Sequence, residues 1–206
     1  MLSISPVTLV GQFVILETLT HKHFAELIAA GSDSAIWTHS WPQNQAEPKS
    51  LERYFTRQLE QLQAQQFLPF TIRHKDTQQI IGNTTYNNFQ ISNHGLEIGG
   101  TWIIRAFQKT AANTESKYLM LKHAFEELNC VRVQFRVDPD NLNSIQAIER
   151  IGASYEGTLR NNYIVDGQIY DLSLYSIILE EWPRIKQHLE TLLQKVYASG
   201  IEPSLS

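Results

Sequence analysis

Three strand-length segments, joined by two short turns, occupy the middle of the chain and limit the folds it can adopt. The strands are predicted at 67–74, 79–91 and 96–104, and the turns at 75–77 and 92–95 have hairpin compositions. Strands joined so closely pair antiparallel, so this part of the chain forms a meander. A further strand or short hairpin is predicted at 7–19, where Gly11 interrupts a β-rich segment.

Helices and strands alternate around this meander. Apolar spacing predicts helices at 20–30, 50–62, 113–128 and 143–151, and a C-terminal helix at about 183–198. Further strands are predicted at 131–137, 155–165 and 168–179, the last two joined by the Asp166-Gly167 turn. This order describes one mixed α/β (α+β) domain that covers residues 1–206. An exposed apolar stripe on the last helix would allow a homodimer.

Composition limits the classes of partner. A net charge of −4 over 206 residues leaves no broad basic face for nucleic acid or anionic lipid. Apolar runs are far shorter than the roughly 18 to 20 residues of a membrane span, and a cytoplasmic protein is expected. Cys130 is the only cysteine and is expected to be buried, while His21, His23 and His39 lack ligand spacing. The sequence therefore predicts no nucleic-acid partner, no membrane partner and no metal.

The most informative segment is GGTWIIRAFQKTAANTESK, residues 99–117. A strand ends near Ile104, a short loop of small residues follows, and a helix is predicted to begin at Asn113. Unpaired N–H groups and the positive end of the helix dipole suit a pyrophosphate there. The alternative is an ordinary connection capped by Asn113, and the residues alone leave both interpretations open.

The loop resembles the acetyl-CoA-binding motif of the GNAT superfamily of N-acetyltransferases: Gln or Arg, two residues, Gly, any residue, then Gly or Ala. The motif falls on Gln108, Ala111 and Asn113, so both glycine positions are substituted. Four segments resemble the branch related to ribosomal-protein N-terminal acetyltransferases: Lys109–Glu115, His123–Glu126, Ala147–Ala153 and Tyr175–Ile178. The resemblance implies a GNAT-like acyl-CoA N-acyltransferase fold, a mixed twisted sheet flanked by helices.

The resemblance also implies acetyl-CoA as cosubstrate and no metal. The residues expected to contact acetyl-CoA are Ile103, Ile104, Gln108, Lys109, Thr110, Ala111, Ala112, Asn113, Thr114 and Asn141. A backbone N–H near the first two would stabilise an oxyanion, and Gly99-Gly100 suggests a strand bulge that opens the sheet there. Arg105, Lys109 and Lys117 add positive charge, although such charges usually form a solvated face. For Asn141, capping of the next helix is the alternative role.

Acetyl transfer to an amine requires proton removal from the amine and departure of the sulfur. At pH 7, deprotonation costs about 1 kcal/mol for an α-amine but about 5 kcal/mol for a lysine, so a weak base suffices for a protein N-terminus. Glu97, in the strand that leads to the loop, is the candidate base; exposure to solvent or pairing with an arginine is the alternative. Ser144 is the candidate acid, because Ile148 occupies the position where many superfamily members have tyrosine.

The sequence says less about which residues contact the acceptor amine. The resemblance places Trp37 and His39 in a loop that faces the acceptor, and Tyr86 is a further candidate; core packing is the alternative for the tryptophan. The predicted function is transfer of acetyl from acetyl-CoA to a primary amine, above all a protein or peptide N-terminus, by direct attack in a ternary complex. The alternatives are a non-catalytic acyl-CoA-binding module, or an acetyltransferase of a small amine such as a polyamine, amino acid or antibiotic.

Overall fold

The computed structural model describes residues 5–38, 45–165 and 167–199. The strands of these residues form one sheet in the order β1-β2-β3-β4-β5-β6-β8-β7. Their bounds are β1 (Thr8–Val10), β2 (Val14–Thr18), β3 (Leu68–His74), β4 (Ile80–Gln90), β5 (Gly95–Ile103), β6 (Arg132–Val137), β7 (Ser154–Val165) and β8 (Gln168–Ile178). The predicted meander is confirmed as β3-β4-β5, and the segment at 7–19 is a hairpin of β1 and β2.

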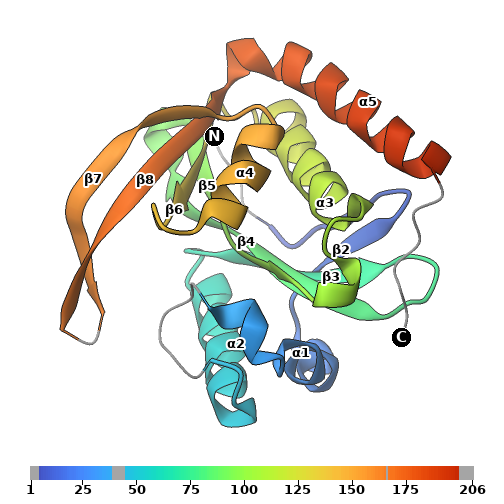
Figure 1. The fold of residues 1–206 in the computed structure, drawn as a ribbon, viewed down its shortest axis with the longest axis vertical. Helices are drawn as coiled ribbons and strands as arrows, with labels where there is room; N and C mark the ends of the chain where they lie inside the picture. Colours follow the sequence, from blue (N-terminus) through green and yellow to red (C-terminus); the bar gives the residue numbers. More distant parts are fainter. Residues whose placement is uncertain (1–4, 39–44, 166, 200–206) are drawn as a thin grey trace.

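Helices cover both faces of the sheet (Figure 1). They are α1 (Phe24–Gly31), α2 (Pro48–Gln63), α3 (Ala111–Lys122), α4 (Leu142–Arg150) and α5 (Trp182–Ser199). One core forms beneath α1 and α2, and a second, larger core contains residues of α3, α4 and α5 on the opposite face. The predicted fold class, a mixed sheet flanked by helices, is therefore confirmed. None of the helices in the described ranges combines the length and hydropathy that a membrane span requires.

Among the described residues, all strand pairs are antiparallel except β5 and β6. These two pair in parallel only between Gly95–Glu97 and Arg132–Gln134. Beyond this register β5 continues to Ile103 and β6 to Val137, so the two strands separate toward their C-terminal ends. The carboxyl ends of diverging parallel strands are where open α/β sheets bind ligands.

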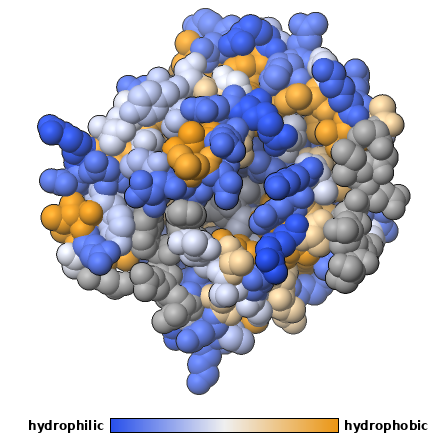
Figure 2. Space-filling model, viewed as in Figure 1, coloured by the Kyte–Doolittle hydropathy of each residue, from blue (hydrophilic) through white to orange (hydrophobic). Residues whose placement is uncertain are grey.

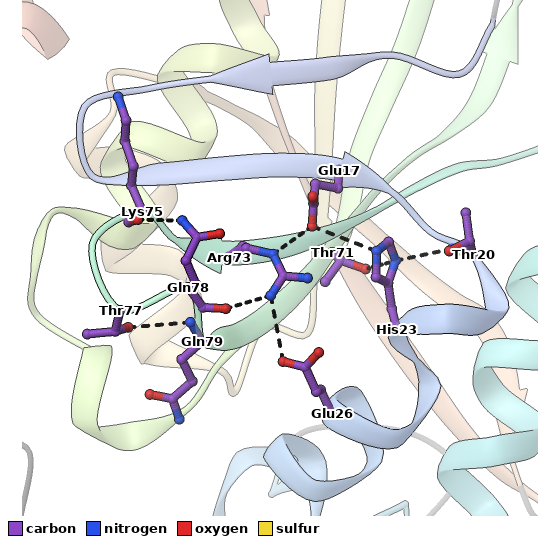
Figure 3. Close-up of polar contacts among 10 residues, drawn as sticks. All are labelled: Glu17, Thr20, His23, Glu26, Thr71, Arg73, Lys75, Thr77, Gln78 and Gln79. Carbon is purple, nitrogen blue, oxygen red and sulfur yellow. Dashed lines mark hydrogen bonds and ion pairs between the residues drawn. The ribbon is translucent and has the colours of Figure 1, made fainter.

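A polar network joins α1 to the sheet (Figure 3). Arg73 of β3 bonds to Glu17 of β2 at 2.8 Å and pairs with Glu26 of α1 at 3.6 Å. His23, just before α1, lies 3.2 Å from the Thr71 hydroxyl, measured from Nδ1, and burial lowers its pKa below the usual value. This histidine therefore has a structural role between helix and sheet.

The C-terminal helix corrects one prediction. Its apolar residues Ile185 and Leu189 are buried, at 1% and 0% exposure, in the core that also contains residues of α3. The stripe is thus covered by the protein's own chain and is not available to a second subunit. On the face shown in Figure 2, hydrophobic residues are scattered among hydrophilic ones rather than gathered in one patch.

Glu115 of α3 connects three distant segments. Its carboxylate accepts hydrogen bonds from the main-chain N–H groups of Gln12, Phe13 and Val14, each at 2.7 Å, and from the hydroxyl of Tyr197 on α5. The residue is 3% exposed. One buried carboxylate therefore holds the β1–β2 turn and the last helix against α3.

We expect Glu115→Ala to lower the free energy of unfolding by at least about 3 kcal/mol, because each buried donor left without a partner costs about 1 to 3 kcal/mol. Urea denaturation followed by circular dichroism measures this loss. The matched control is Glu52→Ala, at an exposed carboxylate of α2, which should change stability by less than about 0.5 kcal/mol. A loss below 1 kcal/mol for Glu115→Ala would contradict the anchoring role.

Candidate active site

The candidate site lies in the gap between β5 and β6, and a bulge in β5 borders it. Asn83 pairs with Trp102 and Thr85 pairs with Gly99, so Gly100 and Thr101 of β5 both lie opposite Thr84 of β4. Gly100 has φ +58°, a left-handed conformation that glycine adopts without strain. The bulge predicted at Gly99-Gly100 is therefore present, and bulges typically redirect a strand next to an active site.

The end of β5 presents one backbone position to the gap. The N–H of Ile104 donates to the carbonyl of Ile81 on the β4 side at 2.9 Å. Successive residues of a strand direct their peptide groups to opposite edges, so those of Ile103 face the β6 side. The carbonyl of Ile103 accepts a bond from Gln108 Nε2 at 2.9 Å, which ties the following loop to the strand. Ile103, and not Ile104, is therefore the candidate oxyanion donor.

The loop after β5 ends in a capped helix. Thr110 is the N-cap of α3: its hydroxyl accepts from the Ala112 N–H at 3.2 Å and donates to the Phe107 carbonyl at 2.7 Å. The helix therefore begins at Ala111, earlier than predicted, and Asn113 lies inside its first turn instead of capping it. Threonine is a preferred N-cap residue, so the residue type at position 110 already favours a helix start there.

The residues at the two glycine positions of the motif, Ala111 and Asn113, carry no backbone strain. The left-handed residue of this loop is Lys109, with φ +62°, whereas Ala111 and Asn113 are helical. Ala111 and Ala112 are fully buried, so their small side chains pack beneath the start of the helix. The Ala112 N–H is taken by the Thr110 cap, whereas the other N–H groups of the first helical turn have no intrahelical partners. Binding of an anion at this helix start would therefore not depend on glycine.

The side chains around the start of α3 differ in whether they are exposed or already bonded to other residues. Lys109 is exposed, while Arg105 pairs with Asp33 at 2.9 Å. Thr114 is buried and accepts a bond from Arg150 of α4 at 2.9 Å, so its hydroxyl joins two helices. The sequence places three charged side chains on a solvated face. One of them, Lys117, is instead buried, at 6% exposure.

Two predicted residues lie at the start of α4, on the same face of the sheet as α3 (Figure 1). Asn141 caps this helix, because its Oδ1 accepts from the Ser144 N–H at 3.0 Å. The capping role left open by the sequence is thus present, and the amide nitrogen of Asn141 still offers two donors. Ser144 is half-buried, and Ile148 is packed in the core.

Glu97 lies at the point where β5 and β6 separate, opposite Gln134 in the register. It is 4% exposed, and its Oε2 accepts from Gln134 Nε2 at 3.1 Å and from Arg136 Nε at 2.6 Å. Pairing with an arginine, left open by the sequence, is therefore present. Within the described part of the chain Oε1 has no hydrogen-bond partner, and it lies 3.3 Å from where a Cβ on Gly99 would stand. The carboxylate is thus held by one oxygen and open at the other, beside the bulge.

Two of the predicted acceptor contacts, Trp37 and Tyr86, are not brought to this gap. Trp37 is 9% exposed, donates from Nε1 to the Gly31 carbonyl at 2.7 Å, and packs against Trp102. Tyr86 is fully buried, and its hydroxyl donates to the Met120 carbonyl on the α3 side of the sheet. Both side chains are core residues, so the structure contradicts the expected role of Tyr86. His39 lies outside the described residues.

Sequence reasoning missed Arg136 and Gln134 as partners of Glu97. They share one face of β6 by the alternation visible in the sequence, but which strand lies beside β5 is decided only by the sheet order. Cys130 is buried as predicted, and burial raises the pKa of its thiol to about 12.

Comparison with known sequences agrees with this geometry. The family model described as acetyltransferase (GNAT) domain matches residues 14–154, from β2 to the beginning of β7. YdaF of Bacillus subtilis (strain 168), whose name marks it as a candidate ribosomal N-acetyltransferase, is 33% identical over 103 residues. That alignment covers 50% of this chain and 56% of YdaF, so the chain spans little more than half of this relative.

Solved structures share the fold over most of the chain. A GCN5-related N-acetyltransferase from Brucella melitensis has a TM-score of 0.85 and 25% identity, covering 92% of this chain and 86% of that one. RimJ from Mycobacterium smegmatis, in complex with CoA-disulfide, has a TM-score of 0.76 and 20% identity, covering 91% and 95%. The family match includes the gap, the loop before α3 and the whole of α4. The chain therefore belongs to the acetyltransferase (GNAT) family.

Proposed function

We propose that this protein transfers an acetyl group from acetyl-CoA to a primary amine, and that the acceptor is the N-terminus of a protein or peptide. The observation that carries the proposal is the separation of β5 and β6, with Glu97 where the strands part and the N-terminus of α3 after the end of β5. The ribosomal N-acetylation in the name of YdaF supports this acceptor class. We also propose the cytoplasm as its location.

The residues around the gap fit acetyl-CoA. The first N–H groups of α3 and the exposed Lys109 would hold the phosphates, and the Ile103 N–H on the β6 side of β5 would bind the thioester carbonyl. The amide nitrogen of Asn141, at the start of α4, would bind the pantetheine arm. When bound, acetyl-CoA supplies the acyl group as an activated thioester.

Glu97 would act through its open oxygen. Arg136 and Gln134 hold Oε2, which leaves Oε1 to accept the proton of the attacking amine, directly or through one water. The amine nitrogen then forms its bond to the thioester carbon while the carbon–sulfur bond breaks, and the sulfur leaves with the electron pair. Ser144 or water would return a proton to it, a modest demand because thiols have a pKa near 8.5.

Mass spectrometry of products formed with isotopically labelled acetyl-CoA tests the proposal. The acceptors are peptides with free N-termini, the same peptides blocked at the N-terminus but containing lysine, and a set of small amines. We expect label on free N-termini only. Label on a small amine would favour the small-amine alternative, and binding of CoA without any labelled product would favour a non-catalytic module.

A further inference from the structure

Lys117 is a buried lysine of α3 whose nearest polar partner is a hydroxyl group. Its Nζ donates to the Thr101 Oγ1 at 2.5 Å, and that oxygen lies 2.7 Å from Thr84 Oγ1. Thr84 also lies 3.6 Å from the sulfur of Met120. No carboxylate within the described ranges forms an ion pair with Lys117. An ammonium group removed from water without a counter-ion is costly, so this position needs an explanation.

Lys117 reaches one side of the β5 bulge directly, through Thr101, and the opposite side through the bond between Thr101 and Thr84. Thr101 is one of the bulged residues, and Thr84 is the residue of β4 that lies opposite them. Lys117 belongs to α3, whose first turn is the proposed site for the phosphates of acetyl-CoA. Lys117 therefore connects the two parts of the proposed acetyl-CoA site, the bulge in the sheet and the start of α3.

Other titratable groups of α3 face elsewhere. Glu115 holds the β1–β2 turn, and the hydroxyl of Tyr118 donates to Glu190 of α5. His123, directly after α3, lies beside Tyr86.

On the strands beneath Lys117 the facing groups are the two threonine hydroxyls, and Arg150 of α4 is directed to Thr114. Burial lowers the pKa of Lys117 to about 7. Near neutral pH the amine can therefore change between a charged donor and a neutral group that also accepts a hydrogen bond from Thr101.

We propose that Lys117 is a positioning residue of the acetyl-CoA site: it holds the bulge of β5 through Thr101 in the conformation that receives the thioester end of the cosubstrate. The inference rests on the proposed function. Because the phosphates carry negative charge to the start of the same helix, their binding favours the protonated lysine. Affinity for CoA should therefore weaken as the pH rises through 7, and it should weaken more in the wild type than in a variant that lacks the Lys117 amine.

Calorimetric titration of the full chain with CoA, between pH 6 and pH 8.5, tests the inference. Lys117→Met removes the amine and keeps the length of the side chain, and Thr101→Val removes its partner. We expect each to weaken CoA binding at least fivefold at pH 6.5, and the double variant to be no weaker than either single one. Thr101→Ser, which keeps the hydroxyl, should bind within twofold of the wild type.

The matched control is Lys122→Met, at an exposed lysine on the same helix, which should leave CoA binding unchanged. Between pH 6 and pH 8.5 the CoA affinity of the wild type should fall by a factor at least threefold larger than that of Lys117→Met. A purely structural role would not produce this difference. Should Lys117→Met fail to fold, Thr101→Val and Thr84→Val carry the test.

Wild-type affinity in a folded Lys117→Met protein at every pH would overturn the inference, as would an equal loss in Lys122→Met. Wild-type protein that binds CoA but acetylates no amine would overturn the proposed function alone. Wild-type protein that binds no CoA would overturn both.

Discussion

Glu97→Gln should lower kcat for acetylation of a peptide N-terminus by at least about 100-fold at pH 7, the smallest factor typical of general base catalysis. Glutamine keeps the shape of the side chain but cannot accept the proton through Oε1. An α-amine with a pKa near 7.8 is mostly protonated at pH 7 and mostly neutral at pH 9. The deficit should therefore shrink as the pH rises, because a neutral amine needs less help from a base. Steady-state rates of thiol release from acetyl-CoA measure this.

The control for this prediction is Glu156→Gln. Glu156 of β7 pairs with Arg132 of β6, so it repeats the glutamate–arginine pairing of Glu97 and Arg136 on the same strand but away from the gap. We expect its kcat to stay within twofold of the wild type. A deficit in Glu97→Gln that is the same at every pH would show that Glu97 only positions its neighbours, and a kcat within threefold of the wild type would remove it from the mechanism.

The stability of the Lys117→Met variant relative to the wild type should fall by about 2 kcal/mol between pH 6 and pH 8.5. Burial lowers the pKa of Lys117 from 10.5 to about 7 in the folded protein, whereas the unfolded chain keeps the ordinary value. Between these two pKa values the unfolded chain binds a proton that the folded chain does not, so the stability of the wild type rises with pH. Below pH 7 both states are protonated and the full cost of the buried charge remains, about 5 kcal/mol relative to an ordinary lysine.

Urea denaturation of both proteins at pH 6, 7 and 8.5 measures this difference. The range ends at pH 8.5 because Cys130 and buried tyrosines have raised pKa values, which lower stability at higher pH. Lys122→Met should show no comparable change with pH. A stability difference between Lys117→Met and the wild type that does not vary with pH would show that Lys117 keeps an ordinary pKa in the folded state.

The two predictions concern the two ends of one site. Glu97 marks the position where β5 and β6 part, and Lys117 supports the bulge that follows along β5. A buried charge that costs stability is the kind of local inconsistency that folded proteins retain mainly at functional sites. The experiments on CoA affinity and on stability examine the same lysine through independent measurements.

Two features that differ from the predictions, the burial of Lys117 and the capping by Thr110, are nevertheless indicated by the sequence. Lys117 precedes Met120 and Leu121, which are buried, at the spacing that places residues on one helix face, so its burial follows from helical periodicity. Thr110 carries an N-cap side chain directly before the small residues of α3. In both cases the local pattern of side chains indicates the observed structure.

The sequence by itself determined the strands, helices and turns, and with them the meander and the loop before α3, because hydrophobic period, capping and turn chemistry act over a few neighbouring residues. Only the tertiary structure decided that Arg136 bonds Glu97, that Lys117 reaches the bulge through Thr101, and that Tyr86 is buried beneath α3. The physical reason is that these contacts join residues far apart along the chain. They depend on the order of strands in the sheet and on the face that each helix covers, and local periodicity specifies neither.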